Sequence, residues 1–352
     1  MKKHGGINAR ELRAQGINPD EVLDFSVSIN PHKLPESIRS VIAQSALERY
    51  PDNDSHDLVE AIAQQYALSK ENIMVVNGTS QAIFLIAAAF LSNTKASSLV
   101  ATPAYREYSD AAQVYGAQCH EIRALAEEQF TPNAPSIIHA LKTHRPQVFW
   151  IGSPNNPTGT LLSHNDAVMI RDACVELGTL MVIDEAYRCF APPEAQRRPL
   201  ISGALYLRSM TKDFSIPGLR LGWLHGDEQV IQHLRSFQPD WSVSAPAQDA
   251  GVACLAQLSE FEATWEKTRG FTQELAQNLK RLGYSPLPTA GNFQLLPIGQ
   301  DDDVKRLISH LKKSLIQVRD CASFGLEGFI RVGTRSQKDN QILLHALESF
   351  SK

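Results

Sequence analysis

Residues 148–159 read VFWIGSPNNPTG, and residues 179–187 read TLMVIDEAY. Each stretch begins with a short apolar run and ends in polar residues. Short apolar runs that stop at turn-forming residues are typical of buried β-strands. In open α/β sheets, ligands bind at the carboxyl ends of the strands. The two stretches therefore predict two strands that place polar residues at one edge of a sheet.

The same alternation of strand and helix continues through most of the chain. Further strands are predicted at Ile73–Val76, 98–101, 204–207 and 221–224, with 148–151 and 179–183 as the strands of the two opening stretches. Strands that alternate with helices favour a mostly parallel sheet covered on both faces. We therefore predict an α/β fold whose large domain spans residues 36–243.

The pattern changes after about residue 244. A long helical stretch is predicted over about 246–282, followed by short strands at 292–297, 315–319 and 329–332 and a last helix over about 338–350. These elements predict a smaller α+β domain at 244–352. Residues 1–35 lack a clear periodic element, and we expect them to pack on the active site or on the small domain.

Composition excludes several classes of protein. The 352 residues carry a formal net charge of −4, so no basic surplus points to a nucleic-acid or membrane partner. The five cysteines are scattered without a CxxC pair, which favours reduced thiols over a disulfide framework. The apolar run 82–91 is about half of the roughly 20 residues that span a bilayer, and the start MKKHGGINARELR lacks an apolar run. We expect a cytoplasmic protein, and the 11 histidines form no cluster with metal-ligand spacing.

Lys212 follows a predicted strand in SMTK (209–212). A lysine amine forms an imine with an aldehyde, best when burial or a neighbouring cation lowers its pKa. A single lysine after a strand is usually a surface charge. Ser209 and Arg220 lie nearby in the sequence and suit a phosphate group, which makes a functional lysine more plausible.

Other strand ends carry groups that would fit a pyridine ring. Asp184 ends its strand, where a carboxylate can hold a ring nitrogen protonated or can simply cap the next helix. Tyr187 and Asn156 can bond to a ring oxygen, although a core tyrosine and a plain turn are the alternatives. Tyr105 can stack on a flat ring or pack in the core.

Gly78-Thr79-Ser80 opens a helix directly after a strand. Free backbone N–H groups and hydroxyls at a helix N-terminus bind anions. Helix capping by Thr79 or Ser80 is the simpler interpretation of this motif alone.

Together these motifs resemble, in order and over nearly the whole chain, the fold type I pyridoxal-phosphate (PLP) enzymes of the aminotransferase class I/II branch. The resemblance implies PLP as cofactor, carried by Lys212 as a Schiff base with Asp184 at its ring nitrogen. It also implies a homodimer in which Tyr50 reaches the cofactor phosphate of the other subunit. The remaining cofactor contacts that it implies are Asn156 and Tyr187 at the ring oxygen, Tyr105 on the ring face, Thr211 beside the lysine, and Gly78, Thr79, Ser80, Ser209 and Arg220 at the phosphate.

Within this branch, two families compete. Histidinol-phosphate aminotransferases share the general plan. Threonine-phosphate decarboxylases of cobalamin biosynthesis are more similar at HGG (4–6), DFSVSINP (24–31), SMTKDFSIPGLRLGW (209–223), VRDCASF (318–324) and GFIRV (328–332). Ile7, Ser28 and Gly333-Thr334 depart from that second pattern, and the last pair is closer to the aminotransferases.

A phosphorylated amino acid needs partners for two anionic groups. Arg331 is the candidate for the carboxylate, because a planar guanidinium binds a carboxylate through two hydrogen bonds. Surface ion pairing is the alternative for each arginine. The other predicted substrate contacts are Arg319, His4, Asn30, the backbone of Gly5 and Gly6, and Asn156, which is counted with the cofactor as well.

The resemblance implies decarboxylation of L-threonine O-3-phosphate to (R)-1-aminopropan-2-yl phosphate and CO2 in cobalamin biosynthesis. The substrate bond held perpendicular to the cofactor ring breaks most easily, so an orientation separates loss of CO2 from transamination. Two alternatives stay open, namely an aminotransferase such as histidinol-phosphate aminotransferase and a non-catalytic PLP-binding protein.

Overall fold

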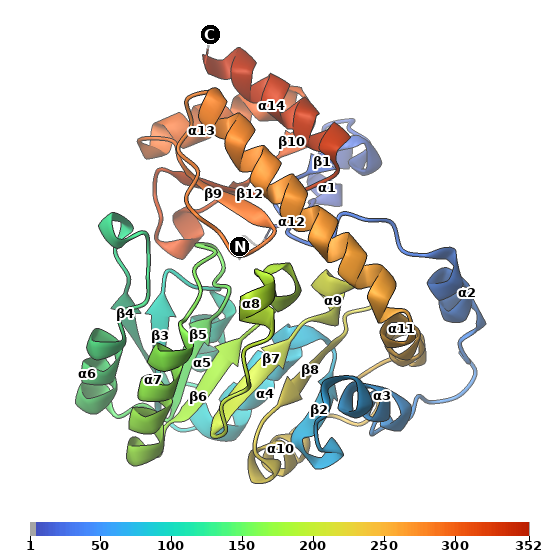
Figure 1. The fold of residues 1–352 in the computed structure, drawn as a ribbon, viewed down its shortest axis with the longest axis vertical. Coiled ribbons are helices and arrows are strands. Elements are labelled where there is room, and N and C mark those ends of the chain that lie inside the picture. The colour runs from blue at the N-terminus through green and yellow to red at the C-terminus, as the bar shows by residue number, and fades with distance from the viewer. Residues whose placement is uncertain (1–4, 352) are drawn as a thin grey trace.

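The computed structural model describes residues 5–351 and contains a seven-stranded sheet in the order β2-β8-β7-β6-β5-β3-β4 (Figure 1). Its strands are β2 (Ile73–Val76), β3 (Ser97–Thr102), β4 (Gln118–Arg123), β5 (Val148–Gly152), β6 (Leu180–Asp184), β7 (Ala204–Arg208) and β8 (Gly222–His225). Neighbouring strands are parallel except that β8 runs antiparallel to β2 and β7. The α/β fold with a mostly parallel sheet is thereby confirmed.

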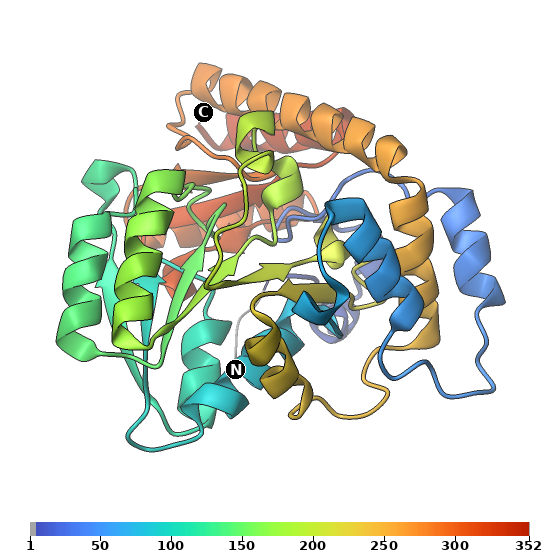
Figure 2. The same ribbon diagram turned by 60° about the horizontal axis from the view of Figure 1, so that its bottom comes forward.

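Helices cover both faces of this sheet, because successive strand residues point to opposite faces. On β5, Val148 and Trp150 join one apolar cluster with α4 and α5, whereas Phe149 and Ile151 join another with α6 and α7. The covering helices are α4 (Gly78–Leu91), α5 (Glu107–Val114), α6 (Ala134–His144), α7 (His164–Leu177) and α10 (Glu228–Arg235). Figure 2 shows the sheet and its covering helices from a second direction. Burial on both faces explains why these strands read as nearly continuous apolar runs.

The long helical stretch predicted over 246–282 consists of two helices, α11 (Ala245–Ala256) and α12 (Leu258–Arg281). The break lies at Gln257, whose backbone has φ −113° and ψ 27°. No Gly or Pro marks the break in the sequence. It follows from packing, since α11 contacts α2 (Glu36–Gln44) and α3 (His56–Tyr66), while α12 continues to α14 (Gln337–Ser351) (Figure 1).

A second, three-stranded sheet has the order β11-β12-β9. Its strands are β9 (Phe293–Pro297), β11 (Arg319–Asp320) and β12 (Phe329–Gly333), and α13 (Asp301–Lys313) packs beside α14. Ile330 and Val332 of β12 pack among apolar residues of α12, α13 and α14. Strand alternation turns Arg331, which lies between them, to the opposite face.

The N-terminal segment runs beside this second sheet (Figure 1). It contains α1 (Ala9–Ala14), and β1 (Leu23–Asp24) pairs in parallel with β10 (Ile316–Gln317). The single strand predicted over 315–319 is therefore wrong, because β10 and β11 belong to different sheets. The proposed domain limits of 1–35, 36–243 and 244–352 stay a prediction.

Two short helices complete the part of the fold that positions the site, α8 (Pro193–Gln196) and α9 (Met210–Asp213). Within residues 5–351, no helix is both long and apolar enough to cross a membrane, and no group of three metal-ligating side chains gathers.

Candidate active site

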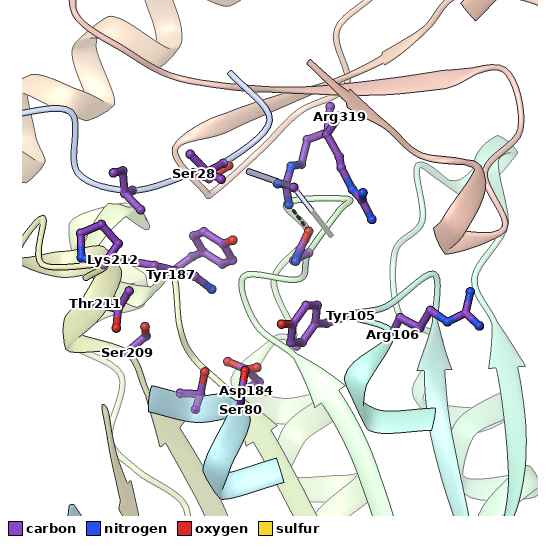
Figure 3. Close-up of a pocket in the computed structure, with 18 of the residues that line it drawn as sticks. Ser28, Ser80, Tyr105, Arg106, Asp184, Tyr187, Ser209, Thr211, Lys212 and Arg319 are labelled. Atoms are coloured by element: carbon purple, nitrogen blue, oxygen red, sulfur yellow. Dashed lines mark hydrogen bonds between the residues drawn. The ribbon is translucent and has the colours of Figure 1, made fainter. Parts of the chain in front are cut away.

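A cavity of about 270 Å³ lies where the carboxyl ends of the large sheet's strands face the second sheet and the N-terminal segment. Figure 3 shows side chains from these three parts of the fold around it. The cavity brings together most of the site residues predicted from the sequence. Those that line it are Gly5, Thr79, Ser80, Tyr105, Asn156, Asp184, Tyr187, Ser209, Thr211, Lys212, Arg220, Arg319 and Arg331.

Lys212 lies on the one-turn helix α9 at the end of β7. Its Nζ atom is 4.1 Å from the centroid of the Tyr187 ring. The Thr211 hydroxyl fixes the turn, since it donates to the Leu221 carbonyl at 3.1 Å and accepts from the Leu221 N–H at 3.2 Å. The hydrogen bonds between the Thr211 hydroxyl and the Leu221 backbone therefore hold the lysine at the cavity wall (Figure 3).

Asp184 ends β6 and is 8% exposed. Its Oδ1 atom accepts from the Ala186 N–H at 2.9 Å, and its Oδ2 atom accepts from the Tyr108 hydroxyl at 2.7 Å. A buried carboxylate fixed by two donors at the cavity floor suits a protonated ring nitrogen.

The start of α4 meets Arg220 at one end of the cavity. Gly78 has φ +72°, and a Cβ atom there would lie 2.9 Å from the Arg220 Nη2 atom. Glycine at this position, with its left-handed backbone and no side chain, therefore leaves room for the guanidinium beside the N-terminus of α4. With Thr79, Ser80 and Ser209 beside them, the exposed N–H groups and hydroxyls form a cradle that fits a phosphate.

Arg319 and Arg331 face the cavity from the second sheet. They lie directly opposite each other in the antiparallel pair β11–β12, so their side chains share one face. The Arg331 guanidinium donates to the Asn156 side-chain oxygen and, at 2.8 Å, to the Ser26 carbonyl. The Arg319 Nη2 atom donates to the Ser323 hydroxyl at 2.7 Å.

These two arginines are buried like charges. They are 8% and 5% exposed, and among the described residues neither forms an ion pair with a carboxylate. Burial and the neighbouring Arg331 lower the pKa of Arg319. Two buried cations side by side are costly without an anionic partner. The arrangement therefore indicates a ligand with anionic groups.

Besides Gly78, three predicted residues in the described part of the chain do not line the cavity, and a fourth, His4, cannot be placed. Gly6 donates its N–H to the Ser26 hydroxyl at 2.8 Å and does not line the cavity. Asn30 donates through its side chain to the Asp213 carbonyl and to Thr264, at 3.0 and 2.8 Å, so it braces the Lys212 turn. Tyr50 is 74% exposed and stacks on Trp241. His4 lies outside the described residues, and the roles of all four stay predictions.

The structure adds residues that the sequence reasoning missed. Tyr108 is buried against Asp184, to which its hydroxyl donates. Its spacing of three residues from Tyr105 is a sequence signal that could have indicated it. Ser28 lines the cavity with a buried hydroxyl that has no partner among the described residues. Arg106 also lines the cavity, and its Nε atom lies 3.3 Å from Asp110.

Asp213 follows Lys212 and turns into the protein behind it. Its Oδ1 atom is buried, and burial raises the pKa of this carboxyl to about 7 in spite of the Cys189 thiol and the Arg208 charge. The folded protein therefore binds this proton more tightly than the unfolded chain does. The contribution of Asp213 to stability falls as the pH rises from about 4 to about 7.

Replacing Asp213 by asparagine is expected to remove the loss of stability that ionisation of this carboxyl causes as the pH rises. From pH 5 to pH 8, the unfolding free energy of the D213N variant should rise relative to that of the parent protein by on the order of 1–3 kcal/mol. Urea unfolding at both pH values measures the difference. The control is D302N, whose side chain is 87% exposed. Parallel pH dependences of the parent protein and D213N would show that the carboxyl does not titrate in this range.

Comparisons with known proteins agree with this geometry. Residues 20–348 match the family described as aminotransferase class I and II. The chain is 33% identical to threonine-phosphate decarboxylase of Salmonella typhimurium, over 98% of this chain and 96% of that protein. It is 32% identical to histidinol-phosphate aminotransferase of Sinorhizobium fredii, over 92% of this chain and 86% of that protein.

A solved structure shares the fold. The histidinol-phosphate aminotransferase of Sinorhizobium meliloti in complex with pyridoxal-5′-phosphate superimposes with a TM-score of 0.87, covering 98% of this chain and 95% of that one, at 20% identity.

Proposed function

This chain belongs to the aminotransferase class I and II family and uses pyridoxal 5′-phosphate, and from this premise we propose that it decarboxylates L-threonine O-3-phosphate in cobalamin biosynthesis. The products would be (R)-1-aminopropan-2-yl phosphate and CO2. Bound PLP withdraws electrons from the Cα atom of an attached amino acid, so the Cα bond perpendicular to its ring is weakened. The protein's residues decide which bond takes that position.

The observation that carries the proposal is the charge of the cavity. Among the residues that the structure describes, five cationic side chains line it, against the one carboxylate of Asp184. Lys212 and Arg220 are assigned to the cofactor. Arg319, Arg331 and Arg106 are then left for the substrate, which suits a molecule with both a carboxylate and a phosphate.

The contacts of the two buried arginines indicate which anionic group of the substrate each would bind. Arg331 is fixed from two sides by Asn156 and Ser26, which suits it to orient the substrate carboxylate. Arg319 is turned toward Ser323 and suits the phosphate, with the Gly5 backbone and Ser28 as further donors. Lys212 Nζ at the cavity wall is placed to hand a proton to the Cα atom after CO2 leaves.

A homodimer is part of the proposal. Tyr50 and Trp241 stack with ring centroids 4.4 Å apart and are 74% and 48% exposed. Such an exposed aromatic pair is suited to an interface between copies of this chain. In it, Tyr50 would approach the cofactor phosphate of the other subunit.

Transamination is the second candidate, because the similarity to histidinol-phosphate aminotransferase is nearly as high. A substrate panel separates the two. With threonine phosphate alone, we expect stoichiometric CO2 and no keto acid. Turnover of histidinol phosphate with 2-oxoglutarate, and no CO2 from threonine phosphate, would reject the decarboxylase.

A further inference from the structure

The Tyr108 hydroxyl lies directly beneath the candidate cofactor site. Tyr108 belongs to α5, is 2% exposed and donates to the Asp184 Oδ2 atom at 2.7 Å. The Ala186 N–H already bonds to the Oδ1 atom at 2.9 Å. Both oxygens of the carboxylate are thus held by the protein, one from the main chain and one from this side chain.

Packing fixes the ring of Tyr108 as firmly as its hydroxyl. The ring stacks on Trp150 of β5, with centroids 5.1 Å apart and planes 8° apart. It also meets Tyr105 in an edge-to-face arrangement, with centroids 5.9 Å apart and planes at 85°. Tyr108 therefore touches both Asp184, assigned to the ring nitrogen, and Tyr105, assigned to the ring face.

The hydroxyl remains a neutral donor at all working pH values. Burial is the main cause that raises the pKa of Tyr108 well above its usual value, followed by the Asp184 charge, Tyr105 and Tyr187. A hydrogen bond to the charged form of a carboxyl favours that form. Tyr108 thereby gives the Asp184 carboxylate a hydrogen-bond donor that keeps its own proton.

We propose that Tyr108 is a positioning residue for the cofactor, which acts by holding the Asp184 carboxylate and the Tyr105 ring against it. This inference rests on the assignment of Asp184 to the ring nitrogen. It adds a residue whose hydroxyl acts through Asp184 and does not itself reach the substrate.

The test is Tyr108→Phe, which keeps the ring on Trp150 and removes only the hydroxyl. We expect the Kd for PLP to rise about tenfold, because a hydrogen bond to a charged group is lost. The pH midpoint of the cofactor's visible absorbance should move upward, since the positive end of the O–H dipole no longer offsets the Asp184 charge. kcat should fall with little change in KM.

The matched control is Tyr206→Phe. Tyr206 is also buried, at 3% exposure, and its hydroxyl accepts a 2.7 Å hydrogen bond from the Ile201 N–H, away from the cavity. This variant should lose stability without a change in cofactor affinity or absorbance midpoint. If Y108F behaves like Y206F, with both cofactor readouts at their original values, Tyr108 has only a structural role.

Asp184→Asn completes a double-mutant cycle and separates the two levels of the inference. In the D184N background, Y108F should have no further effect on the PLP Kd, because its route of action is already removed. Independent, additive losses would overturn the proposal for Tyr108 alone. A D184N variant with unchanged cofactor affinity and spectrum would instead overturn the assignment of Asp184.

Discussion

Replacement of Lys212 by alanine is expected to lower turnover by roughly 10³-fold or more and to abolish the visible imine absorbance of the holoenzyme, because no other amine of the described residues lines the cavity. The α9 turn does not depend on the lysine side chain, since Thr211 holds it through the Leu221 backbone. The variant should therefore fold normally, and thermal unfolding checks this.

Lys305→Ala is the matched control for Lys212→Ala. Lys305 lies on α13 with a 64% exposed side chain, paired with Asp301 at 2.7 Å. It should keep both the spectrum and the activity. Substantial turnover by K212A would mean that another group carries the cofactor.

The second large effect is expected from Arg331→Lys. Lysine keeps the positive charge but lacks the two-pronged guanidinium, so it cannot bond to Asn156, Ser26 and a carboxylate together. We expect kcat/KM for threonine phosphate to fall about 10²- to 10³-fold, as for other buried charge pairs that lose one partner. The PLP Kd should stay within about twofold of the parent value, since Arg331 is assigned to the substrate.

Arg335→Lys provides the comparison for that variant. Arg335 lies four residues further along the chain, where its Nε atom pairs with Asp339 at 3.1 Å and its guanidinium lies over Phe25. It does not line the cavity, and kcat/KM should hardly change. A loss of PLP affinity in R331K as large as the loss in kcat/KM would move Arg331 from the substrate to the cofactor.

The strands of the large sheet could be predicted because burial on both faces leaves them almost wholly apolar. β2 has the predicted limits, and the four residues of β5 predicted as a strand are followed by one glycine. β4 escaped prediction because it is an edge strand with a half-polar sequence, QCHEIR. The pairing of β1 with β10 involves only two residues on each strand, too few for a recognisable pattern.

The residues of the candidate site that could be predicted are those that directly follow a strand. Asp184, Asn156 and Lys212 each follow a strand, and the sheet brings them to one edge. Tyr108 and Asp213 face inward from helices; the spacing from Tyr105 is the one local signal for Tyr108, and Asp213 has none. For Asn30 the sequence motif indicated a place near the site but not the contact. The structure shows that its side chain bonds to the turn that carries Lys212.

The pairing of β1 with β10 also bears on how the chain is made. Leu23 lies opposite Ile316, and the Phe25 carbonyl accepts from the Gly333 N–H at 2.7 Å. During synthesis, residues 23–25 leave the ribosome long before their partners at 316–333 are translated. Closing so long a loop is slow compared with forming local contacts. The large sheet can therefore assemble before residues 5–30 are in place, and the part of the cavity wall that they form is completed only after residues 316–333 have been translated.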